Sequence, residues 1–316
     1  MKRILMVRMG AMGDIVHTLP SAATLRRAFP EAEIDWLVDE HWAPLLDDNP
    51  HLTAVRKLRK RDFSSILRMI GELRERRYDC AIDFQGLMKS AAIAGLAGAA
   101  QAIGFRMEAL REKLAAACYT NTVAVPLDGH VVEQNLALAH ASGARESVIE
   151  FPLPTGEEPP AGDYLAISPS AGWAAKRWPP EKFAELVRRV ERQMGWTTIV
   201  NCGPGDEELA QHVVNASGGR ARVVQAGIRA LIGVARHARA FVAGDTGPLH
   251  IAAAVGTPVV AVFGPTSPRR NGPYAKRVRI VRAPGVSTTY ARSASGTDIA
   301  RVSVDDVYQA LVEVIA

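Results

Sequence analysis

The chain is poor in the residues that build disulfide frameworks and metal sites. It has three cysteines in 316 residues, and Cys80, Cys118 and Cys202 form no C-x-x-C pair. An odd, scattered set of this kind argues against disulfides and structural zinc, and it favours a reducing cytosol. The eight histidines include no H-E-x-x-H spacing, and no Asp-x-Asp motif occurs. We therefore expect a cytoplasmic protein that binds no metal and needs no cofactor.

Long apolar runs are also missing. None reaches the ~18 residues of a membrane-spanning helix. The apolar start of the chain is interrupted by Arg8 and leads into glycines, so it predicts a buried first strand rather than a signal peptide. The length of 316 residues exceeds one ordinary core and fits two domains. A net charge of +5 favours anionic partners such as phosphates, acidic sugars or an anionic membrane face, without indicating nucleic-acid binding.

Strand-like and helix-like segments alternate along both halves of the chain. In the first half, strands are predicted at residues 3–9, 33–38, 53–58 and 80–84, and helices at 64–77, 89–99 and 131–142. In the second half, the alternating segments are 164–168, 181–193, 197–202, 206–216, 222–225, 230–237, 241–243, 250–255, 259–263 and 304–315. This alternation predicts parallel sheets covered by helices.

A Pro-rich segment separates the two halves. Residues 152–162, PLPTGEEPPAG, predict an interdomain linker. We therefore predict one domain at residues 1–154 and a second at 163–316. Both are predicted to be α/β, doubly wound and Rossmann-like, an architecture called GT-B whose ligand cleft lies at the carboxyl ends of the strands. The last helix could also pack back on the N-terminal domain, and Pro20 predicts that the first helix begins near it rather than at Asp14.

The segment GAMGD, residues 10–14, directly follows the first predicted strand. Gly10 and Gly13 allow backbone amides to approach a ligand closely, but their spacing is not that of a dinucleotide site. Asp14 can serve as a carboxylate that accepts a proton from a sugar hydroxyl. It can equally cap a helix, and spacing alone leaves both interpretations open.

Two turns in the second half suit a nucleotide diphosphate. Ser170 and Ala171 belong to a small-residue turn that exposes amides, and Lys176 adds a point charge. The alternative is a solvated lysine beside a structural tryptophan. In the next turn, Asp206 or Glu207 can accept the ribose hydroxyls of a nucleotide, or can complement a helix dipole.

The segment GDTGPLH, residues 244–250, is the most informative one. A strand, a glycine, an acid, a hydroxyl, a second glycine and a helix form an anion-binding turn, in which Thr246 donates from its side chain and backbone. Asp245 is a poor phosphate ligand and is expected to orient the turn or contact a sugar hydroxyl. His17 and His250 are predicted to pack or hydrogen-bond rather than to bind a metal. A purely structural turn is the alternative.

A basic stretch occupies residues 56–61, RKLRKR, with Arg74, Arg76 and Arg77 further along. It suits recognition of a phosphorylated or carboxylated acceptor and attraction to an anionic leaflet. The alternative is an ordinary solvated face.

Five motifs, taken together and in order, resemble the lipopolysaccharide heptosyltransferases. They are MGDIVHTLP (12–20), DFQGLMKS (83–90), AAKRWP (174–179), GDTGPLHIAAA (244–254) and FGPTSP (263–268). The resemblance spans both halves, and Pro248 is its one departure, harmless in a first helical turn. It implies a metal-independent, inverting transfer of L-glycero-D-manno-heptose from ADP-heptose to the Kdo of Kdo-lipid A. The enzyme would work as a peripheral protein at the cytoplasmic face of the inner membrane, and the segment 83–90 favours the first heptose addition.

The resemblance also implies that the N-terminal domain, 1–154, binds the acceptor and that the C-terminal domain, 163–316, binds the nucleotide sugar. It implies roles for individual residues as well. Asp14 would be the general base, Lys176 would neutralise the donor diphosphate, and Asp206 or Glu207 would hold the ribose. The full set predicted to bind the donor is Ser170, Ala171, Lys176, Asp206, Glu207, Asp245, Thr246, Gly247 and His250, with Gly10 and Gly13 in a donor loop. The residues predicted to meet the acidic acceptor are Arg59, Lys60, Arg61 and Arg111. Alternatives are the second heptose addition, a nucleotide-sugar epimerase, and a basic nucleotide-binding module at the membrane surface without enzyme activity.

Overall fold

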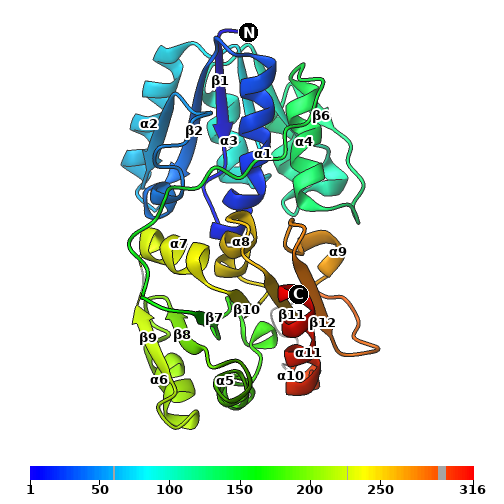
Figure 1. The fold of residues 1–316 in the computed structure, drawn as a ribbon. Coiled ribbons are helices and arrows are strands. Elements are labelled where there is room, and N and C mark those ends of the chain that lie inside the picture. Colours follow the sequence, from blue (N-terminus) through cyan, green and yellow to red (C-terminus); the bar gives the residue numbers. More distant parts are fainter. Residues whose placement is uncertain (60, 226, 291–296) are drawn as a thin grey trace. The chain divides into compact units, whose positions relative to one another are not determined.

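The computed structural model describes residues 1–316 except 60, 226 and 291–296 (Figure 1). The chain forms two compact units, Met1–Pro154 and Thr155–Ala316. The division therefore falls inside the Pro-rich segment 152–162. Among the described residues, no helix has the length and apolar character needed to cross a membrane.

The first unit is built on a parallel sheet with the strand order β3-β2-β1-β4-β5-β6. The strands are β1 (Arg3–Val7), β2 (Glu33–Asp39), β3 (Ala54–Leu58), β4 (Cys80–Asp83), β5 (Gln101–Phe105) and β6 (Asn121–Val123). β1 lies inside the sheet, where Leu5 pairs with Asp35 of β2 and Ala81 of β4. Its residues 4–7 have no exposed surface, which explains the continuous apolar run of a strand covered on both faces.

Helices cover both faces of this sheet. They are α1 (Met12–Ala28), α2 (Phe63–Arg76), α3 (Met88–Leu96) and α4 (Val131–Ala141), with short 3-10 helices η1 (Glu40–Leu45), η2 (Met107–Ala109) and η3 (Lys113–Cys118). α1 packs against α4. Met69 and Leu73 of α2 share one buried cluster with Ile93 of α3 and with Leu5 and Val7 of β1. The α2 and α3 helices therefore form one layer, as right-handed crossovers require.

The start of α1 differs from the prediction. The helix begins at Met12 and carries Pro20 in its interior, whereas the sequence predicted a start near Pro20. A proline there removes one hydrogen bond and typically costs about 3 kcal/mol. The helix tolerates this cost because every residue from Ile15 to Leu25 is buried, so tertiary packing outweighs local propensity.

The second unit has its own parallel sheet, in the order β12-β11-β10-β7-β8-β9. The strands are β7 (Tyr164–Ser168), β8 (Thr197–Cys202), β9 (Ala221–Gln225), β10 (Ala240–Gly244), β11 (Val259–Phe263) and β12 (Val278–Arg282). The helices are η4 (Ala174–Lys176), α5 (Pro180–Met194), α6 (Glu207–Ala216), α7 (Ile228–His237), α8 (Gly247–Ala254), α9 (Pro268–Asn271), α10 (Thr297–Ala300) and α11 (Val304–Ile315).

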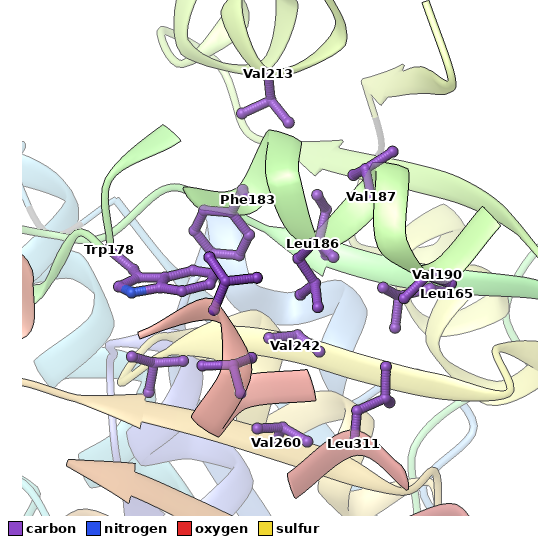
Figure 2. Close-up of a cluster of buried hydrophobic side chains, with 14 of the residues drawn as sticks. Leu165, Trp178, Phe183, Leu186, Val187, Val190, Val213, Val242, Val260 and Leu311 are labelled. Carbon is purple, nitrogen blue, oxygen red and sulfur yellow. The ribbon is translucent and has the colours of Figure 1, made fainter. Parts of the chain in front are cut away.

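The core of the second unit sits between β7, β10, β11 and the helices α5 and α11 (Figure 2). Trp178 and Phe183 meet edge to face with ring centroids 4.8 Å apart. The Trp178 indole donates to the Val302 carbonyl at 3.1 Å, so the ring is satisfied in its buried position. Val307 and Leu311 of α11 are fully buried in the same cluster. The apolar face of the last helix therefore belongs to this core, and its packing on the N-terminal domain stays a prediction.

Three strands were not predicted: β5, β6 and β12. β5 contains Gly104, which lowers its strand propensity, and β6 has only three residues. β12 reads VRIVR and has no fully buried residue, so its pattern resembles that of an exposed segment. The other predicted elements are present, with ends shifted by three residues at most. The largest shifts are in α8, which begins at Gly247 rather than at residue 250, and in α3, which ends at Leu96 rather than at residue 99.

Candidate active site

Both sheets place their first strand beside their fourth. β1 pairs with β2 and β4, and β7 pairs with β8 and β10. In such sheets, the loops that leave these two central strands diverge to opposite faces and open a crevice at the carboxyl ends. We call the carboxyl ends of β1 and β4 the first switch point, and those of β7 and β10 the second switch point. Most of the predicted site residues follow one of these four strands or their neighbours.

Asp14 lies at the first switch point, in the first turn of α1. One carboxylate oxygen, Oδ2, is 2.6 Å from an Arg8 guanidinium nitrogen and accepts from the Ala11 backbone N–H at 3.2 Å. The side chain of Asp14 remains 44% exposed, whereas that of Arg8 is only 9% exposed. Asp14 therefore does contact the helix start, as the capping alternative requires, and it also presents an open carboxylate. Gly10 and Gly13 lie in the same loop and first turn.

Arg8 is held by the strands around it. A second guanidinium nitrogen donates to the Phe84 carbonyl, directly after β4. The Arg8 carbonyl accepts from the buried Trp36 indole at 3.1 Å, and the neighbouring Met9 amide donates to the Gln85 side chain at 2.8 Å. The loop that carries Asp14 is thus tied to the end of β4. Sequence reasoning missed Arg8, and its only signal was a charge inside an otherwise apolar strand.

The motif DFQG centres on a buried acid. Asp83 is fully buried and accepts hydrogen bonds from the Tyr119 hydroxyl at 2.7 Å, the Ser90 hydroxyl at 2.8 Å and the Gln85 amide at 2.8 Å. Burial raises the pKa of Asp83, although these hydrogen bonds oppose the shift. Asp83 thus fixes the turn at the end of β4 and has no exposed surface for a ligand.

At the second switch point, Lys176 and Asp245 form an ion pair. The Lys176 ammonium lies 2.6 Å from Asp245 Oδ2, with the lysine side chain 20% exposed and the aspartate 7%. The Thr266 hydroxyl donates to the same oxygen at 2.8 Å, and His250 Nε2 lies 3.4 Å from Oδ1. Burial alone would raise the pKa of Asp245, but the hydrogen bond from His250 and the charge of Lys176 lower it well below its usual range.

Two glycines allow these segments to meet. A Cβ atom on Gly244 would lie 2.5 Å from the Lys176 carbonyl oxygen, and one on Gly264 would lie 2.6 Å from the Ala175 carbonyl oxygen. Such distances are too short for any side chain, so both positions require glycine for close approach. The motifs AAKRWP, GDTGPLH and FGPTSP therefore converge on one place. Asp245 contacts Lys176, Thr266 and His250 within this cluster, and the contacts of Asp245 and His250 with a donor stay predictions.

Several polar atoms around this ion pair have no hydrogen-bond partner among the described residues. Within the described part of the chain, the buried hydroxyls of Ser168, Ser170 and Thr246 and the indole nitrogen of Trp173 make no hydrogen bond. Thr246 and Gly247 begin α8, whose first amides point away from the helix. Buried polar groups are rarely left unsatisfied in native proteins. This cluster, together with Ala171, therefore has the chemistry of a site for a phosphate- and hydroxyl-rich ligand.

Asp206 and Glu207 follow β8, the strand next to β7. Asp206 lies 3.7 Å from Arg177, and exposed Glu207 accepts from the Gln225 side chain at 2.6 Å. Both stand at the start of α6, so the helix-dipole and ribose-binding interpretations both stay predictions. Among the described residues, no group of three or more His, Cys, Asp or Glu side chains is arranged to hold a metal ion.

Two of the predicted acceptor residues line a hollow in the first unit. Arg59 and Arg61 border a cavity of about 690 Å³ together with His41 and Trp42 of η1, Asp39, Glu40 and Asp62. Lys60 lies outside the described residues. Arg111 is exposed and follows β5, which β2, β1 and β4 separate from β3, so Arg111 is not part of this hollow. Sequence reasoning missed Trp42, whose signal is an aromatic residue just after a predicted strand.

The basic stretch 56–61 has a second role. Arg56 lies 2.9 Å from the fully buried carboxylate of Asp35, and the Tyr78 hydroxyl donates to the same oxygen at 2.6 Å. Arg76 lies 3.7 Å from this oxygen and also pairs with Glu33. Arg56 and Arg76 are thus committed to the fold, and the interpretation of the whole stretch as acceptor recognition is wrong for these two.

Comparison with known proteins agrees with these features. The family described as glycosyltransferase family 9 (heptosyltransferase) matches residues 66–295. The lipopolysaccharide heptosyltransferase 1 of Pseudomonas aeruginosa is 30% identical over 297 residues, which cover 87% of this chain and 82% of that protein. The same-named protein of Escherichia coli K12 is 29% identical over 302 residues, covering 89% and 94%.

A solved structure agrees in fold. The E. coli heptosyltransferase WaaC with ADP has 27% sequence identity and a TM-score of 0.82, over 99% of this chain and 100% of that one. The predicted fold class, two Rossmann-like domains of the GT-B type, is confirmed. The predicted resemblance is confirmed as well: the chain belongs to glycosyltransferase family 9, the heptosyltransferases.

Proposed function

We propose that this enzyme transfers L-glycero-D-manno-heptose from ADP-heptose to the Kdo of Kdo-lipid A, with inversion at the anomeric carbon. The observation that carries the proposal is the ion pair of Lys176 and buried Asp245, beside four polar atoms without a partner in the described residues. The relatives named above, at 29–30% identity, are called lipopolysaccharide heptosyltransferase 1, which favours the first heptose addition over the second.

The donor is assigned to the second unit. As the anomeric carbon of the heptose gains positive charge in the transition state, negative charge grows on the leaving diphosphate. Lys176 and the first amides of α8 at Thr246 and Gly247 supply positive charge at that place, and fixed charges act best where charge develops. Asp245 does not touch the phosphates in this proposal. It holds Lys176 in position, and we expect the reaction to need no metal ion.

The base is assigned to the first unit. A hydroxyl of the acceptor attacks the anomeric carbon, the bond to the diphosphate oxygen breaks, and ADP leaves with the bonding electrons. Asp14 takes the hydroxyl proton, because its carboxylate is open on one side and anchored by Arg8 on the other. In this proposal the first unit supplies the base, Asp14, and the second unit supplies the cation, Lys176.

The acceptor is assigned to the hollow beside η1. Kdo and lipid A carry carboxylate and phosphate groups, and the exposed Arg59 and Arg61 can pair with them. We propose that Arg111 meets an acidic group further along the same edge. The enzyme would act as a peripheral protein at the cytoplasmic face of the inner membrane.

The direct test is to incubate the protein with ADP-heptose and Kdo-lipid A that lacks heptose, and to weigh the lipid by mass spectrometry. The expected product carries one heptose more. Transfer only to an acceptor that already carries a heptose would support the second addition instead. Turnover of a nucleotide sugar without acceptor would identify an epimerase, and ADP binding without any turnover would identify a binding module.

A variant separates chemistry from binding. Asp14→Asn should abolish transfer while calorimetry finds ADP affinity close to that of the unchanged protein. Normal turnover in Asp14→Asn would remove Asp14 from the mechanism and leave the donor assignment standing.

A further inference from the structure

Large apolar side chains are exposed at one edge of the first unit. Phe63 is 72% exposed and Leu114 is 77% exposed, which is unusual for residues of this size. The group consists of Phe63, Leu67, Met88, Met107 and Leu114, each at least 40% exposed. We call these five residues the apolar rim.

The elements that carry the rim all begin at the carboxyl ends of neighbouring strands. Phe63 and Leu67 lie one turn apart at the start of α2, which follows β3. Met88 opens α3 after β4, and Met107 and Leu114 belong to η2 and η3 after β5. α2 contacts α3, α3 contacts η3, and η2 contacts η3. Because all strands of this sheet are parallel, the rim lies at the same edge as Asp14, which follows β1.

Cationic side chains surround the rim. Among the described residues, the exposed cations of these segments are Arg59, Arg61, Arg68, Arg74, Lys89, Arg106, Arg111 and Lys113, and the exposed acids are Asp62, Glu72, Glu75, Glu108 and Glu112. Arg59 pairs with Glu40 at 3.0 Å and Arg68 with Glu72 at 3.9 Å, and the remaining cations still outnumber the remaining acids. Two of the acids are used by the fold itself. Asp62 caps α2 through the Ser64 amide at 2.9 Å, and Glu112 accepts from the Met88 amide at 2.6 Å.

We propose that the apolar rim docks on an anionic bilayer, with Phe63 and Leu67 entering the interface and the surrounding arginines and lysines meeting lipid phosphates. This inference rests on the proposed function, because a sugar attached to lipid A lies within a short distance of the bilayer surface. The base that deprotonates its hydroxyl must therefore come close to the membrane. The edge that carries Asp14 is the one with an apolar rim and an excess of positive charge.

The combination of side chains fits a lipid surface better than a protein partner. Aromatic and aliphatic residues flanked by arginine and lysine are typical of surfaces that lie in the membrane interface. Each basic residue near an anionic leaflet adds attraction that salt weakens. A face for a second copy of this chain would bring like charges together, which opposes association.

The test measures binding of the full-length protein to vesicles that hold no acceptor and no donor. Phosphatidylcholine vesicles with about one-third phosphatidylglycerol should bind the protein, and vesicles of pure phosphatidylcholine should bind it several-fold less. Phe63→Ser together with Leu67→Ser should lower the partition coefficient about 10-fold or more, since two apolar side chains no longer leave water. Both residues are exposed, so the variant is expected to fold, which circular dichroism checks.

A matched control replaces apolar residues of similar exposure elsewhere. Leu96, at the far end of α3, is 52% exposed, and Ile280 of the second unit is 45% exposed. Leu96→Ser with Ile280→Ser should leave vesicle binding unchanged. A folded Phe63→Ser, Leu67→Ser variant that binds like the unchanged protein would overturn the proposal. Equal binding to vesicles with and without phosphatidylglycerol would overturn it as well.

Sedimentation velocity tests whether a second copy of this chain, rather than a bilayer, covers the rim. If the Phe63→Ser, Leu67→Ser variant turns a dimer into a monomer and leaves vesicle binding unaltered, the rim is an interface between copies and the proposal is wrong. Because no transfer is measured, this result is independent of the reaction. If the protein transfers heptose but does not bind vesicles, the proposed function stands and only the docking surface is refuted.

Discussion

Lys176 and Asp245 offer the sharpest test of the donor site, because one substitution should affect stability and binding by separable amounts. Lys176→Met removes the cation and keeps most of the apolar volume. Asp245, 7% exposed, would keep Thr266 and His250 as partners but lose the charge at 2.6 Å. Breaking a buried pair typically costs 3–5 kcal/mol. Since two partners remain and Lys176 is partly exposed, we expect a loss of about 2–3 kcal/mol in unfolding free energy.

The effect on binding should be of similar size. A charged hydrogen bond to phosphate contributes roughly 1.5–3 kcal/mol, so Lys176→Met should raise the Kd for ADP about 10- to 100-fold. Urea unfolding measures the first effect and titration calorimetry the second. The double variant Lys176→Met with Asp245→Asn should recover most of the stability, because no unpaired charge remains buried, but it should not recover ADP affinity.

Lys182 provides the matched control. Its ammonium donates to the carbonyls of Ala300 at 2.6 Å and Val302 at 2.7 Å, and it is likewise partly buried. Lys182→Met should cost stability without changing ADP affinity. Unchanged ADP affinity in Lys176→Met would refute the placement of the diphosphate. Recovery of affinity in the double variant would show that the ion pair shapes the site and that the lysine charge does not bind the ligand.

Three further outcomes are expected. Arg8→Met should lower kcat about 10- to 100-fold at unchanged KM for the donor. In an Asp14→Asn background the same substitution should have no added effect. An unchanged kcat in the single variant would show that Arg8 does not act through Asp14. Gly104→Ala should destabilise the first unit in urea by about 1–3 kcal/mol, since its Cβ would lie 2.3 Å from the Tyr119 ring; equal stability would mean that the ring can move. Because the pKa of Asp245 is depressed in the folded state, its contribution to stability is complete above the unfolded pKa of about 3.9 and is lost as the pH falls. The wild-type protein should therefore lose stability more steeply in acid than Asp245→Asn, and parallel pH curves would contradict this.

The sequence predicts the layers of this fold well, because apolar runs such as residues 4–7 and 259–263 belong to strands that are buried on both faces. It predicts edges unevenly: the edge strands β3 and β9 were predicted, whereas β6 and β12 were missed. These two strands pair on one side only, so their residues need not be apolar, and little periodic signal remains to identify them. The start of α1 was wrong for a related reason, since the packing that offsets Pro20 comes from segments distant in sequence.

Sequence motifs predicted most members of the candidate site, including buried Asp245 and His250, but not which of these residues contact one another. Lys176 and Asp245 are 69 residues apart, and only the adjacency of β7 and β10 brings them into contact. Local spacing contains no information on that adjacency. The same limit explains why the role of Arg56 was not predicted. In the sequence it belongs to a basic stretch typical of a solvated face, and only the fold places it against buried Asp35.

Each switch point carries an ion pair with one buried and one more exposed member, and the charge of the buried member is opposite in the two pairs. At the first, the cation is buried and the acid is open: Arg8 is 9% exposed and Asp14 44%. At the second, the acid is buried and the cation is more open: Asp245 is 7% exposed and Lys176 20%. In each pair the buried member is fixed by further hydrogen bonds and so orients the exposed one at no cost during the reaction. The proposed inverting transfer needs a carboxylate to receive a proton and a cation to meet a diphosphate. The exposed member of each pair is the one with the charge that the chemistry requires.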